Sequence, residues 1–478
     1  MNIKAHIRDE IIDLDYSKVK KIYIQGICGT AMSGVAKILI SDGKIVFGSD
    51  NNLYSPIKEL LEDLKVEIIQ GMSEKNLEKN PDLVIVGNIM SRDHPESIAV
   101  RKKNIPYISF PELFKSYYLK DRIPIVIAGT NGKTTTTALL SHCLQFLGED
   151  PSYFIGGISL NFNSNAKLGK GKYFVLEGDE YETAYFEKTP KFWHFNPNFT
   201  IITSFAYDHI DFFSTYKDYK NAFLHFISLI SNKENIFICL DNSKDLFEIV
   251  KDEKITTYGF SKKAIFKISK ILNINMNGST YIADWKNEKI QIKIPIWGKQ
   301  NIRNSFGVFC LLKKLGFKNE EIIDSFLNFK GVKRRQEILY KDGNYILIDD
   351  FAHHPDAVFV TLQSIKKYLK DFKIIAIFEP RTNTSRTSFF QKKYSESFKY
   401  SDEVIILPPP PPKGEHRPLN LQNLIKEIKD EGKDVFLGIN SEETLNYIRK
   451  TLKPKTAIVT LSNGPMGGLP QKILSTFF

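Results

Sequence analysis

One segment restricts the fold of this chain more than any other. An apolar run at 125–128 is followed by the loop Gly129 to Gly132, and then by Lys133 and Thr134. The run predicts a buried strand, and the apolar residues at 138–140 predict a helix after the loop. A strand, a glycine loop and a helix in this order surround an anion with backbone N–H groups and a lysine. We therefore expect a phosphate cradle within an α/β domain.

The match to the usual phosphate-binding loop is incomplete. That pattern has a further glycine five residues before Gly132, where this chain has Ile127. The alternative is an ordinary strand–turn–helix unit with a chance Gly-Lys-Thr. We favour the cradle because the strand, the turn glycines, the lysine and the threonine occur in the required order. In a cradle, Lys133 neutralises phosphate charge and the hydroxyl of Thr134 can bind Mg²⁺.

Strand-like segments alternate with helical patterns along the chain, which predicts mostly parallel sheets. The expected strands are 20–26, 45–47, 66–69, 83–86, 125–128, 173–176, 200–202, 345–348, 374–377, 404–406 and 457–459, and a helical pattern covers 302–315. A chain of 478 residues exceeds one domain. With a linker at 117–122 and a third α/β region from about 332, we expect domains at 1–119, 120–330 and 331–478. The five prolines from Pro408 to Pro412 predict a stiff surface loop.

Composition excludes several classes of protein. The net charge of +11 comes from lysines spread along the chain, whereas nucleic-acid binders concentrate basic residues on one face. No apolar run reaches eighteen residues, and the N-terminus lacks the apolar core of a signal peptide. Four scattered cysteines fit a reducing compartment. We expect a cytoplasmic protein with anionic small-molecule substrates and no nucleic-acid or membrane partner.

Acidic residues follow two of the expected strands. Glu177 begins the acidic turn 177–180 after the strand 173–176, where a carboxylate near a phosphate loop can bind Mg²⁺. A solvated acidic turn is the alternative. His209 follows the strand 200–202 and lies between Asp208 and Asp211. It could bind a second metal ion or hold a polar group of the substrate, and the alternative is a purely structural histidine.

Three further groups carry polar side chains at helix or strand ends. Asn301 and Asn304 lie one turn apart at the start of an expected helix, where they could contact a nucleotide or cap the helix. Arg334 and Arg335 precede the third region and could reach a terminal phosphate. Asp350 follows the strand 345–348, near a His-His-Pro whose spacing gives no closed tetrahedral zinc site.

The first expected strand ends in another glycine loop, Gly26 to Gly34. Cys28 occupies the position of the second glycine of a dinucleotide fingerprint, so the loop predicts a diphosphate at a helix start and argues against a dehydrogenase. Asp50 follows the second strand, where an acidic residue can reach a ribose hydroxyl.

Taken in order, these motifs resemble the Mur ligases of peptidoglycan synthesis over the whole chain. The matching segments are Gly129-Thr130-Asn131-Gly132-Lys133-Thr134-Thr135, Glu177, Asp208-His209-x-Asp211, Gly298-x-x-Asn301-x-x-Asn304, Arg334-Arg335 and Asp349-Asp350-x-Ala352-His353-His354-Pro355. The chain departs from the family pattern where Ser204 replaces an asparagine and Gln300 a histidine, and Leu224 stands where some members carry a carbamylated lysine.

Finer motifs resemble one branch of the family. These are Gly26-Ile27-Cys28-Gly29-Thr30, Gly87-Asn88-x-Met90-x-Arg92, Glu379-Pro380-Arg381-Thr382-Asn383-Thr384 and Ser462-Asn463-Gly464-x-x-Gly467-Gly468. They are similar to the branch that adds a tripeptide during cell-wall recycling. The branch that adds L-alanine usually has a glycine at the position of Cys28 and a different stretch around 379–384.

The resemblance implies an ATP-dependent amide ligase with three domains. Two are Rossmann-like, an N-terminal UDP-binding domain and a C-terminal peptide-binding domain, and a P-loop ATPase domain lies between them. It implies ATP and Mg²⁺ as cofactors, UDP-N-acetylmuramate and the murein tripeptide as substrates, and a monomer. The catalytic residues would be Lys133, Glu177, His209 and Arg335.

The remaining roles also follow from the resemblance. ATP would contact Gly129, Thr130, Asn131, Gly132, Lys133, Thr134, Thr135, Asn301, Asn304, Arg335 and Asp350. The metal would contact Thr134, Glu177 and His209. The UDP-sugar would contact Gly26, Ile27, Cys28, Gly29, Thr30, Asp50 and Asn88, and the peptide Arg381, Asn383 and Arg386.

Several alternatives stay open from the sequence. An L-alanine-adding ligase has the same build, whereas a folate-type polyglutamate ligase lacks the N-terminal domain. A regulatory P-loop protein would bind nucleotide without acceptor-dependent turnover. The motifs leave open whether the third residue of the acceptor is diaminopimelate or lysine.

Overall fold

The computed structural model describes residues 2–53, 57–207, 212–250, 252, 254–381, 384–409 and 417–478, apart from the side chains of 249 and 384. These residues form two compact units, up to residue 331 and from 332 to 478. Asp208, His209 and Asp211, together with Asn383 and Pro410 to Pro412, lie outside the described residues.

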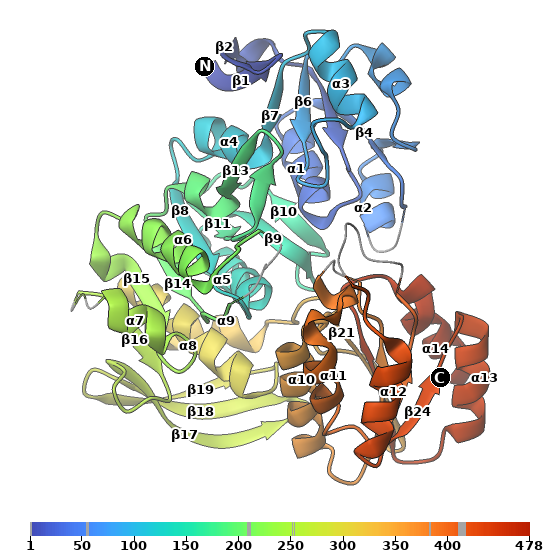
Figure 1. Ribbon diagram of the computed structural model, residues 1–478. Coiled ribbons are helices and arrows are strands. Elements are labelled where there is room, and N and C mark those ends of the chain that lie inside the picture. The colour runs from blue at the N-terminus through green and yellow to red at the C-terminus, as the bar shows by residue number, and fades with distance from the viewer. Residues whose placement is uncertain are drawn as a thin grey trace. The chain divides into compact units, whose positions relative to one another are not determined.

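The first unit begins with a seven-stranded sheet (Figure 1), which has the order β2-β1-β7-β6-β3-β4-β5. Its strands are β1 (Asn2–Ile7), β2 (Glu10–Asp15), β3 (Lys21–Gln25), β4 (Ile45–Asp50), β5 (Glu67–Gln70), β6 (Leu83–Val86) and β7 (Tyr107–Ser109). Its helices are α1 (Thr30–Ser41), α2 (Ile57–Asp63), α3 (Pro95–Lys102) and α4 (Phe110–Leu113).

The five parallel strands of this sheet have a switch point between β3 and β6. The chain runs from β3 to β4 and β5 on one side, then to β6 and β7 on the other. Ligands of open α/β sheets bind outside the carboxyl ends of the strands at such a point. Gly26 follows β3 and Gly87 follows β6, so both predicted loops lie at this edge.

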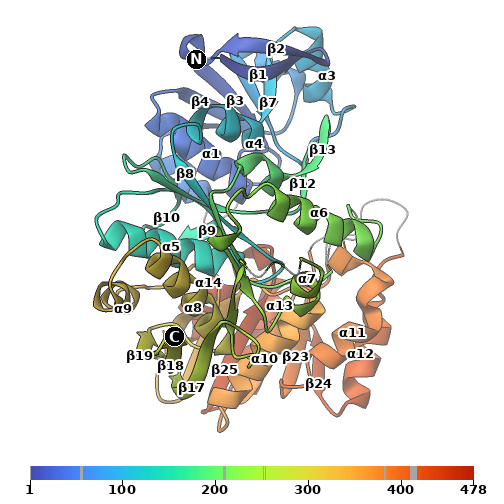
Figure 2. The same cartoon turned by 90° about the vertical axis from the view of Figure 1, so that its left-hand side faces the viewer.

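The hairpin β1–β2 was not expected from the sequence. It pairs antiparallel along its whole length and joins β7 at one edge of the sheet (Figure 2). The segments expected as strands at 20–26, 45–47, 66–69 and 83–86 do form strands, so the parallel core of this sheet is confirmed.

A ten-stranded sheet follows, with the order β10-β9-β11-β8-β14-β15-β16-β17-β18-β19. Its strands are β8 (Ile123–Ala128), β9 (Ser152–Ser159), β10 (Ser164–Lys167), β11 (Tyr173–Glu177), β14 (Phe199–Ile202), β15 (Ile236–Cys239), β16 (Thr256–Gly259), β17 (Phe266–Asn275), β18 (Gly278–Trp285) and β19 (Glu288–Ile294). The seven neighbours β9, β11, β8, β14, β15, β16 and β17 pair in parallel. At one edge β10 pairs antiparallel with β9, and at the other β18 and β19 extend the sheet as an antiparallel meander.

Five helices accompany this sheet: α5 (Lys133–Phe146), α6 (Tyr216–Ser228), α7 (Lys244–Val250), α8 (Lys299–Lys314) and α9 (Asn319–Leu327). A separate hairpin consists of β12 (Glu182–Ala184) and β13 (Glu187–Pro190). The helix after the phosphate loop begins at Lys133, earlier than the apolar residues at 138–140 indicated. The threonines at 134–137 take part in the helix, and all but Thr135 are buried.

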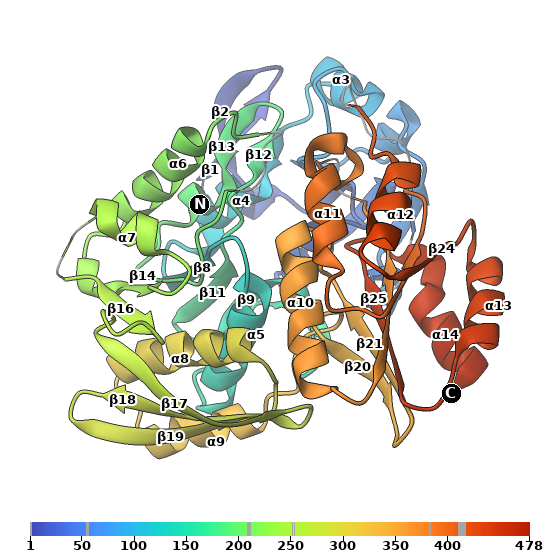
Figure 3. The ribbon, with the colours of Figure 1, turned by 60° about the horizontal axis from the view of Figure 1, so that its bottom comes forward.

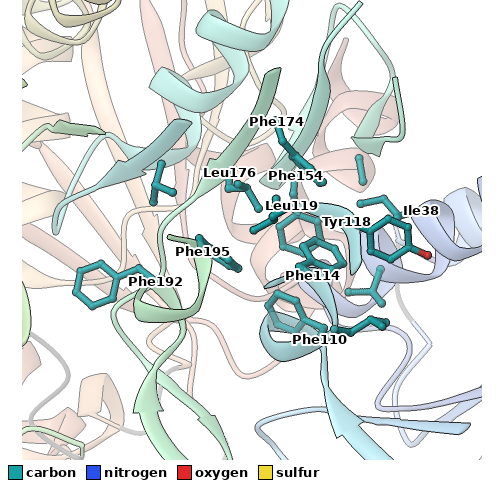
Figure 4. Close-up of a cluster of buried hydrophobic side chains, with 14 of the residues drawn as sticks. Ile38, Phe110, Phe114, Tyr118, Leu119, Phe154, Phe174, Leu176, Phe192 and Phe195 are labelled. Atoms are coloured by element: carbon teal, nitrogen blue, oxygen red, sulfur yellow. The ribbon is translucent and has the colours of Figure 1, made fainter. Parts of the chain in front are cut away.

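Aromatic packing joins the two sheets of the first unit. Phe110 and Phe114, from α4 and the π-helix that follows it, meet Phe154 of β9 and Phe174 of β11 in one buried cluster (Figure 4). The predicted linker at 117–122 begins inside this π-helix (Phe114–Tyr118), and the ring of Tyr118 is buried. This packing explains why residues up to 331 form one unit. The domain boundary at 119 and 120 stays a prediction.

The second unit is a six-stranded sheet with the order β20-β21-β25-β22-β23-β24, flanked by helices (Figure 3). Its strands are β20 (Glu337–Lys341), β21 (Tyr345–Asp350), β22 (Lys373–Phe378), β23 (Glu403–Ile406), β24 (Asp434–Leu437) and β25 (Thr456–Leu461). Its helices are α10 (Pro355–Tyr368), α11 (Gln391–Ser397), α12 (Leu421–Asp430), α13 (Ser441–Thr451) and α14 (Leu469–Phe477). All pairs but β20–β21 are parallel, as the sequence predicts.

Within the described residues, no helix is both long enough and apolar enough to cross a membrane.

Candidate active site

The predicted phosphate loop joins β8 to α5, and its two glycines are sterically required. Gly129 and Gly132 have φ angles of 123° and 92°, which L side chains rarely adopt. A Cβ on Gly129 would lie 2.6 Å from the carbonyl oxygen of Ser204, and one on Gly132 would lie 2.7 Å from Oδ1 of Asn304. The loop therefore fits closely against neighbouring backbone and side chains, and the N-cap Gly132 leaves the first turn of α5 without a side-chain cap.

The other residues of the loop are braced by the segment after β14. The hydroxyl of Thr130 donates to the carbonyl oxygen of Ala206 at 2.7 Å, and the N–H of Asn131 donates to Oγ of Ser204 at 2.7 Å. Ser204 thus supports the loop at the position where the sequence departs from its family pattern. Thr135 lies in the first turn of α5 and is half-buried. Contacts of these residues with ATP stay predictions.

Lys133 forms a buried ion pair. Its Nζ donates to the carbonyl oxygen of Gly129 at 2.6 Å and to the carboxylate of Glu180 at 2.9 Å. The Glu180 side chain is completely buried, and that of Lys133 is 14% exposed. Burial alone would lower the pKa of Lys133, but nearby carboxylates, Glu180 foremost, more than offset it and raise that pKa above its ordinary value. Glu180 was not singled out from the sequence, although it lies in the predicted acidic turn.

Thr134 and Glu177 adjoin each other next to the loop. The hydroxyl of Thr134 donates to Oε1 of Glu177 at 2.9 Å, and the N–H of Gly156 donates to Oε2 at 2.7 Å. A Cβ at Gly156 would lie 2.5 Å from Oε1, so the strand β9 leaves room for this carboxylate. A hydroxyl and a carboxylate at the mouth of a phosphate loop are oxygen ligands of the kind that Mg²⁺ prefers. The residues present therefore fit the metal implied by the sequence.

The first turns of α8 lie against the phosphate loop. Asn304 is buried and its side chain lies next to Gly132, while Nδ2 of Asn301 donates to the carbonyl oxygen of Trp297 at 2.8 Å. Gln300 lies close to Gly132 as well. The structure thus brings Asn304 to the predicted ATP loop, whereas Asn301 bonds back to the segment before α8 and no side chain caps the start of this helix.

The glycine loop after β3 opens helix α1. Gly26 has a φ of 71°, and the N-cap Gly29 provides no side-chain cap, so the helix start offers backbone N–H groups to a ligand. Asp50 ends β4 and accepts from the N–H of Cys28 at 3.0 Å, while its other oxygen accepts from Asn52. Asp50 therefore holds the loop itself, and its contact with uridine stays a prediction.

The other residues predicted to contact the UDP-sugar differ in exposure. The thiol of Cys28 is buried, and burial with the nearby Asp50 carboxylate raises its pKa to about 12. Asn88 is exposed in the turn after β6, at the switch point of the sheet. Ile27 is buried, whereas Thr30 is half-buried at the start of α1. The side chains of Ile27 and Cys28 therefore pack inward, and only their backbone can face a ligand.

In the second unit, Arg334 and Arg335 have different surroundings. Arg334 donates to the carbonyl oxygens of Ser462 and Gly464 at 2.5 and 2.6 Å, so it braces the turn after β25. The guanidinium carbon of Arg335 lies 4.4 Å from the ring centroid of Phe351. Arg334 therefore supports the fold of this unit, and the functional role of Arg335 stays a prediction.

Asp350 is buried at the end of β21. Its two oxygens accept from the N–H groups of Gln336 and Ala352 at 2.8 Å each, and burial raises its pKa. Like Asp50, it supports the adjoining backbone in this structure. A contact of Asp350 or Arg335 with ATP stays a prediction.

The two described arginines of the predicted peptide site lie close enough for their charges to interact. Arg381 forms a 3.4 Å ion pair with Glu379, and a Cβ at Gly464 would overlap its side chain. Burial and the charge of Arg381 lower the pKa of Arg386. Two half-buried cations with one paired carboxylate form a surface suited to a carboxylate-bearing ligand.

Family models match three successive parts of the chain. They are the Mur ligase family catalytic domain at 21–119, the Mur ligase middle domain at 127–312 and the Mur ligase glutamate ligase domain at 334–464. The UDP-N-acetylmuramate–L-alanyl-γ-D-glutamyl-meso-2,6-diaminoheptandioate ligase of Escherichia coli is 32% identical, over 95% of this chain and 97% of its own. The chain belongs to the Mur ligase family.

Other Mur ligases resemble the chain to a similar degree. A UDP-N-acetylmuramate–L-alanine ligase of Acetivibrio thermocellus is 30% identical over 95% of this chain and 96% of its own. A murein peptide ligase structure from Psychrobacter arcticus superposes with a TM-score of 0.73 at 27% identity, covering 95% of this chain and 98% of the other. The alanine ligase of Thermotoga maritima has the same fold, with a TM-score of 0.81 at 24% identity over 96% and 99% of the two chains.

Membership of the family confirms two expectations from the sequence. The chain has the three-domain α/β architecture of a Mur ligase, and it is an ATP-dependent ligase. The structure brings Lys133, Thr134 and Glu177 together at the phosphate loop, as the sequence predicted. Glu180, which the sequence did not single out, joins them as the ion-pair partner of Lys133.

Proposed function

We propose that this Mur ligase joins the tripeptide L-alanyl-γ-D-glutamyl-meso-diaminopimelate to the lactyl carboxylate of UDP-N-acetylmuramate, at the expense of ATP, during peptidoglycan recycling. The main support is that one compact unit contains both a lysine–threonine–glutamate cradle around Lys133 and an uncapped helix start at Gly29. The cradle suits a triphosphate and the helix start suits a diphosphate. The finer sequence motifs and the Escherichia coli relative support the tripeptide as acceptor.

The proposed reaction has two steps. An oxygen of the lactyl carboxylate attacks the γ-phosphorus of ATP, which forms an acyl phosphate and releases ADP. The free amine of the tripeptide then attacks the acyl carbon and loses a proton, and the tetrahedral intermediate expels phosphate. Both steps concentrate negative charge on oxygen, so catalysis requires fixed cations and hydrogen-bond donors.

The chain offers such groups at defined positions. Lys133 is held charged by Glu180 and donates to both carboxylate oxygens of Glu180 and to the carbonyl oxygen of Gly129. Exchanging one of these contacts would let it donate to the β- and γ-phosphates. Thr134 and Glu177 would hold Mg²⁺, which would neutralise charge on the phosphate oxygens when bound. We propose that Arg335 contacts the phosphoryl group during its transfer and that His209 binds a second metal ion.

The acceptor would be bound by the second unit. We assign Arg381 and Arg386 to carboxylates of the tripeptide, which carries more of them than L-alanine does. L-Alanine is the alternative acceptor, since alanine-adding relatives match the chain almost as closely as the tripeptide-adding one.

A phosphate-release assay tests the proposal. UDP-N-acetylmuramate, ATP and Mg²⁺ are held constant, and the acceptor is varied among the tripeptide, its lysine analogue and L-alanine. We expect release with the diaminopimelate tripeptide at least tenfold faster than with L-alanine. Faster turnover with L-alanine would assign the chain to de novo synthesis. ATP binding without any acceptor-dependent release would contradict the ligase proposal.

A further inference from the structure

Glu96 is a buried carboxylate to which the mechanism above gives no role. It lies in the first turn of α3, and its side chain is completely buried. Burying a carboxylate is costly unless several hydrogen bonds stabilise its charge. A negative charge at the start of a helix is also stabilised by the helix dipole.

Five uncharged groups surround this carboxylate. Its Oε1 accepts from the hydroxyl of Tyr23, the amide nitrogen of Asn76 and the backbone N–H of Ser73 at 2.7, 2.9 and 3.0 Å. The hydroxyl of Ser49 lies 2.9 Å from Oε1 and 2.6 Å from the hydroxyl of Tyr23, so these three oxygens share two protons. Its Oε2 accepts from Nε2 of Gln25 at 3.2 Å. A neutral amide oxygen accepts about two hydrogen bonds, whereas an ionised carboxylate can accept more. The arrangement therefore suits a glutamate better than a glutamine.

These groups come from β3, β4 and the segment after β5. Tyr23 is the middle residue and Gln25 the last residue of β3, Ser49 lies next to last in β4, and Ser73 and Asn76 follow β5. Glu96 itself belongs to the helix after β6 and thus comes from the other side of the switch point. One carboxylate thereby joins two strands, the segment after a third and the helix after a fourth.

These segments adjoin the predicted sugar-nucleotide loop directly. Gln25 precedes Gly26, and the carbonyl oxygen of Ser49 accepts from the N–H groups of Gly26 and Ile27 at 2.9 and 3.1 Å. Asp50, the next residue, holds Cys28. Glu96 is therefore linked to the loop through Gln25 at the end of β3 and through Ser49 in β4.

We propose that Glu96 is a positioning residue for the sugar-nucleotide substrate, fixing the loop Gly26 to Thr30 and the segment after β5 in their binding geometry. It acts through Gln25, Ser49, Ser73 and Asn76 and does not touch the substrate. The inference rests on the proposed function, because it takes UDP-N-acetylmuramate as the ligand of this edge.

The test replaces Glu96 by glutamine, which keeps the shape and removes the charge. With too few acceptors, the backbone N–H of Ser73 and the amide of Asn76 compete for one oxygen, and the segment after β5 loosens. We expect the KM for UDP-N-acetylmuramate to rise about tenfold, equivalent to about 1.4 kcal/mol. The KM for ATP and kcat should stay within about twofold of wild type. Calorimetric titration with UDP-N-acetylmuramate alone should show the same loss of affinity.

Ser97→Ala is the matched control. Ser97 is the next residue of the same helix and is buried, and its hydroxyl oxygen has no hydrogen-bond partner. The variant should leave both KM values unchanged. If Glu96→Gln does not fold, Asn76→Ala removes one donor of the cluster and should raise the KM for UDP-N-acetylmuramate in the same selective way.

The outcomes separate this inference from the proposed function. Equal rises in both KM values, or a lower melting temperature with an unchanged KM for UDP-N-acetylmuramate, would overturn the positioning role. If the wild-type protein did not bind UDP-N-acetylmuramate at all, the proposed function itself would fail.

Discussion

The hydroxyl of Thr134 donates a 2.9 Å hydrogen bond to the carboxylate of Glu177, which comes from a neighbouring strand of the central sheet. The two residues are 43 positions apart in the chain. Their contact forms because β8 and β11 are adjacent parallel strands, whose carboxyl ends meet at one edge. That edge supplies the oxygen ligands proposed for Mg²⁺.

Gly156→Ala tests the space that this carboxylate requires. A Cβ at 156 would lie 2.5 Å from Oε1 of Glu177 and would displace the carboxylate from Thr134. We expect the Mg²⁺ concentration for half-maximal phosphate release to rise about tenfold or more, because a displaced ligand loses most of its contribution. Gly343→Ala, at an exposed position with no atom within 4 Å of the new Cβ, is the control. An unchanged Mg²⁺ dependence would remove Glu177 from the metal site.

Lys133→Ala should abolish phosphate release while UDP-N-acetylmuramate still binds. It should also destabilise the protein by about 3–5 kcal/mol, because it leaves Glu180 buried without its cation. Adding Glu180→Gln should recover most of that stability without restoring turnover. Urea unfolding and phosphate release on the wild type, the single variant and the double variant separate the two effects. Peptide-dependent phosphate release by Lys133→Ala would contradict the cradle assignment.

Arg381→Ala should raise the KM for the tripeptide by about tenfold or more and leave that for ATP nearly unchanged. The reason is the loss of a charge-assisted hydrogen bond to a substrate carboxylate. Arg449→Ala, which removes an exposed arginine of α13, controls for the change in net charge. Equal changes in the two KM values would place Arg381 outside the peptide site.

Glu379→Gln should stabilise the second unit in a pH-dependent way. Burial raises the pKa of Glu379 above its ordinary value near 4.5, although Arg381 and Ser462 act in the opposite direction. A carboxyl whose pKa is higher in the folded state loses stability as pH rises from 4.5 through that raised value. A glutamine cannot ionise, so the variant does not lose stability in this way. The unfolding free energy of the variant should therefore equal that of the wild type near pH 4.5 and exceed it at pH 7. Each pKa unit corresponds to about 1.4 kcal/mol. Urea unfolding of both proteins across this pH range measures the difference, and a constant difference would contradict the burial effect.

Sequence patterns predicted the parallel sheets well because buried parallel strands are continuous apolar runs. The segments at 83–86, 125–128, 374–377 and 457–459 are fully buried strands or parts of them. The hairpin β1–β2 was not predicted, although the alternation of apolar and polar residues in β1 is typical of a half-buried strand. The early start of α5 was missed because threonines are weak helix formers, and here tertiary packing overrides propensity.

The sequence by itself determined the chemistry available to this protein: the glycines at 129 and 132, the lysine and threonine that follow them, and the carboxylate at 177. These signals are local, since each depends on residue types next to a strand end. The tertiary structure alone decided the partners. Lys133 forms an ion pair with Glu180, Asp50 and Asp350 accept from backbone N–H groups, and Glu96 contacts five polar groups from β3, β4 and the segment after β5. Such contacts join residues far apart in the chain, and only the packing of strands and helices brings them within hydrogen-bonding distance.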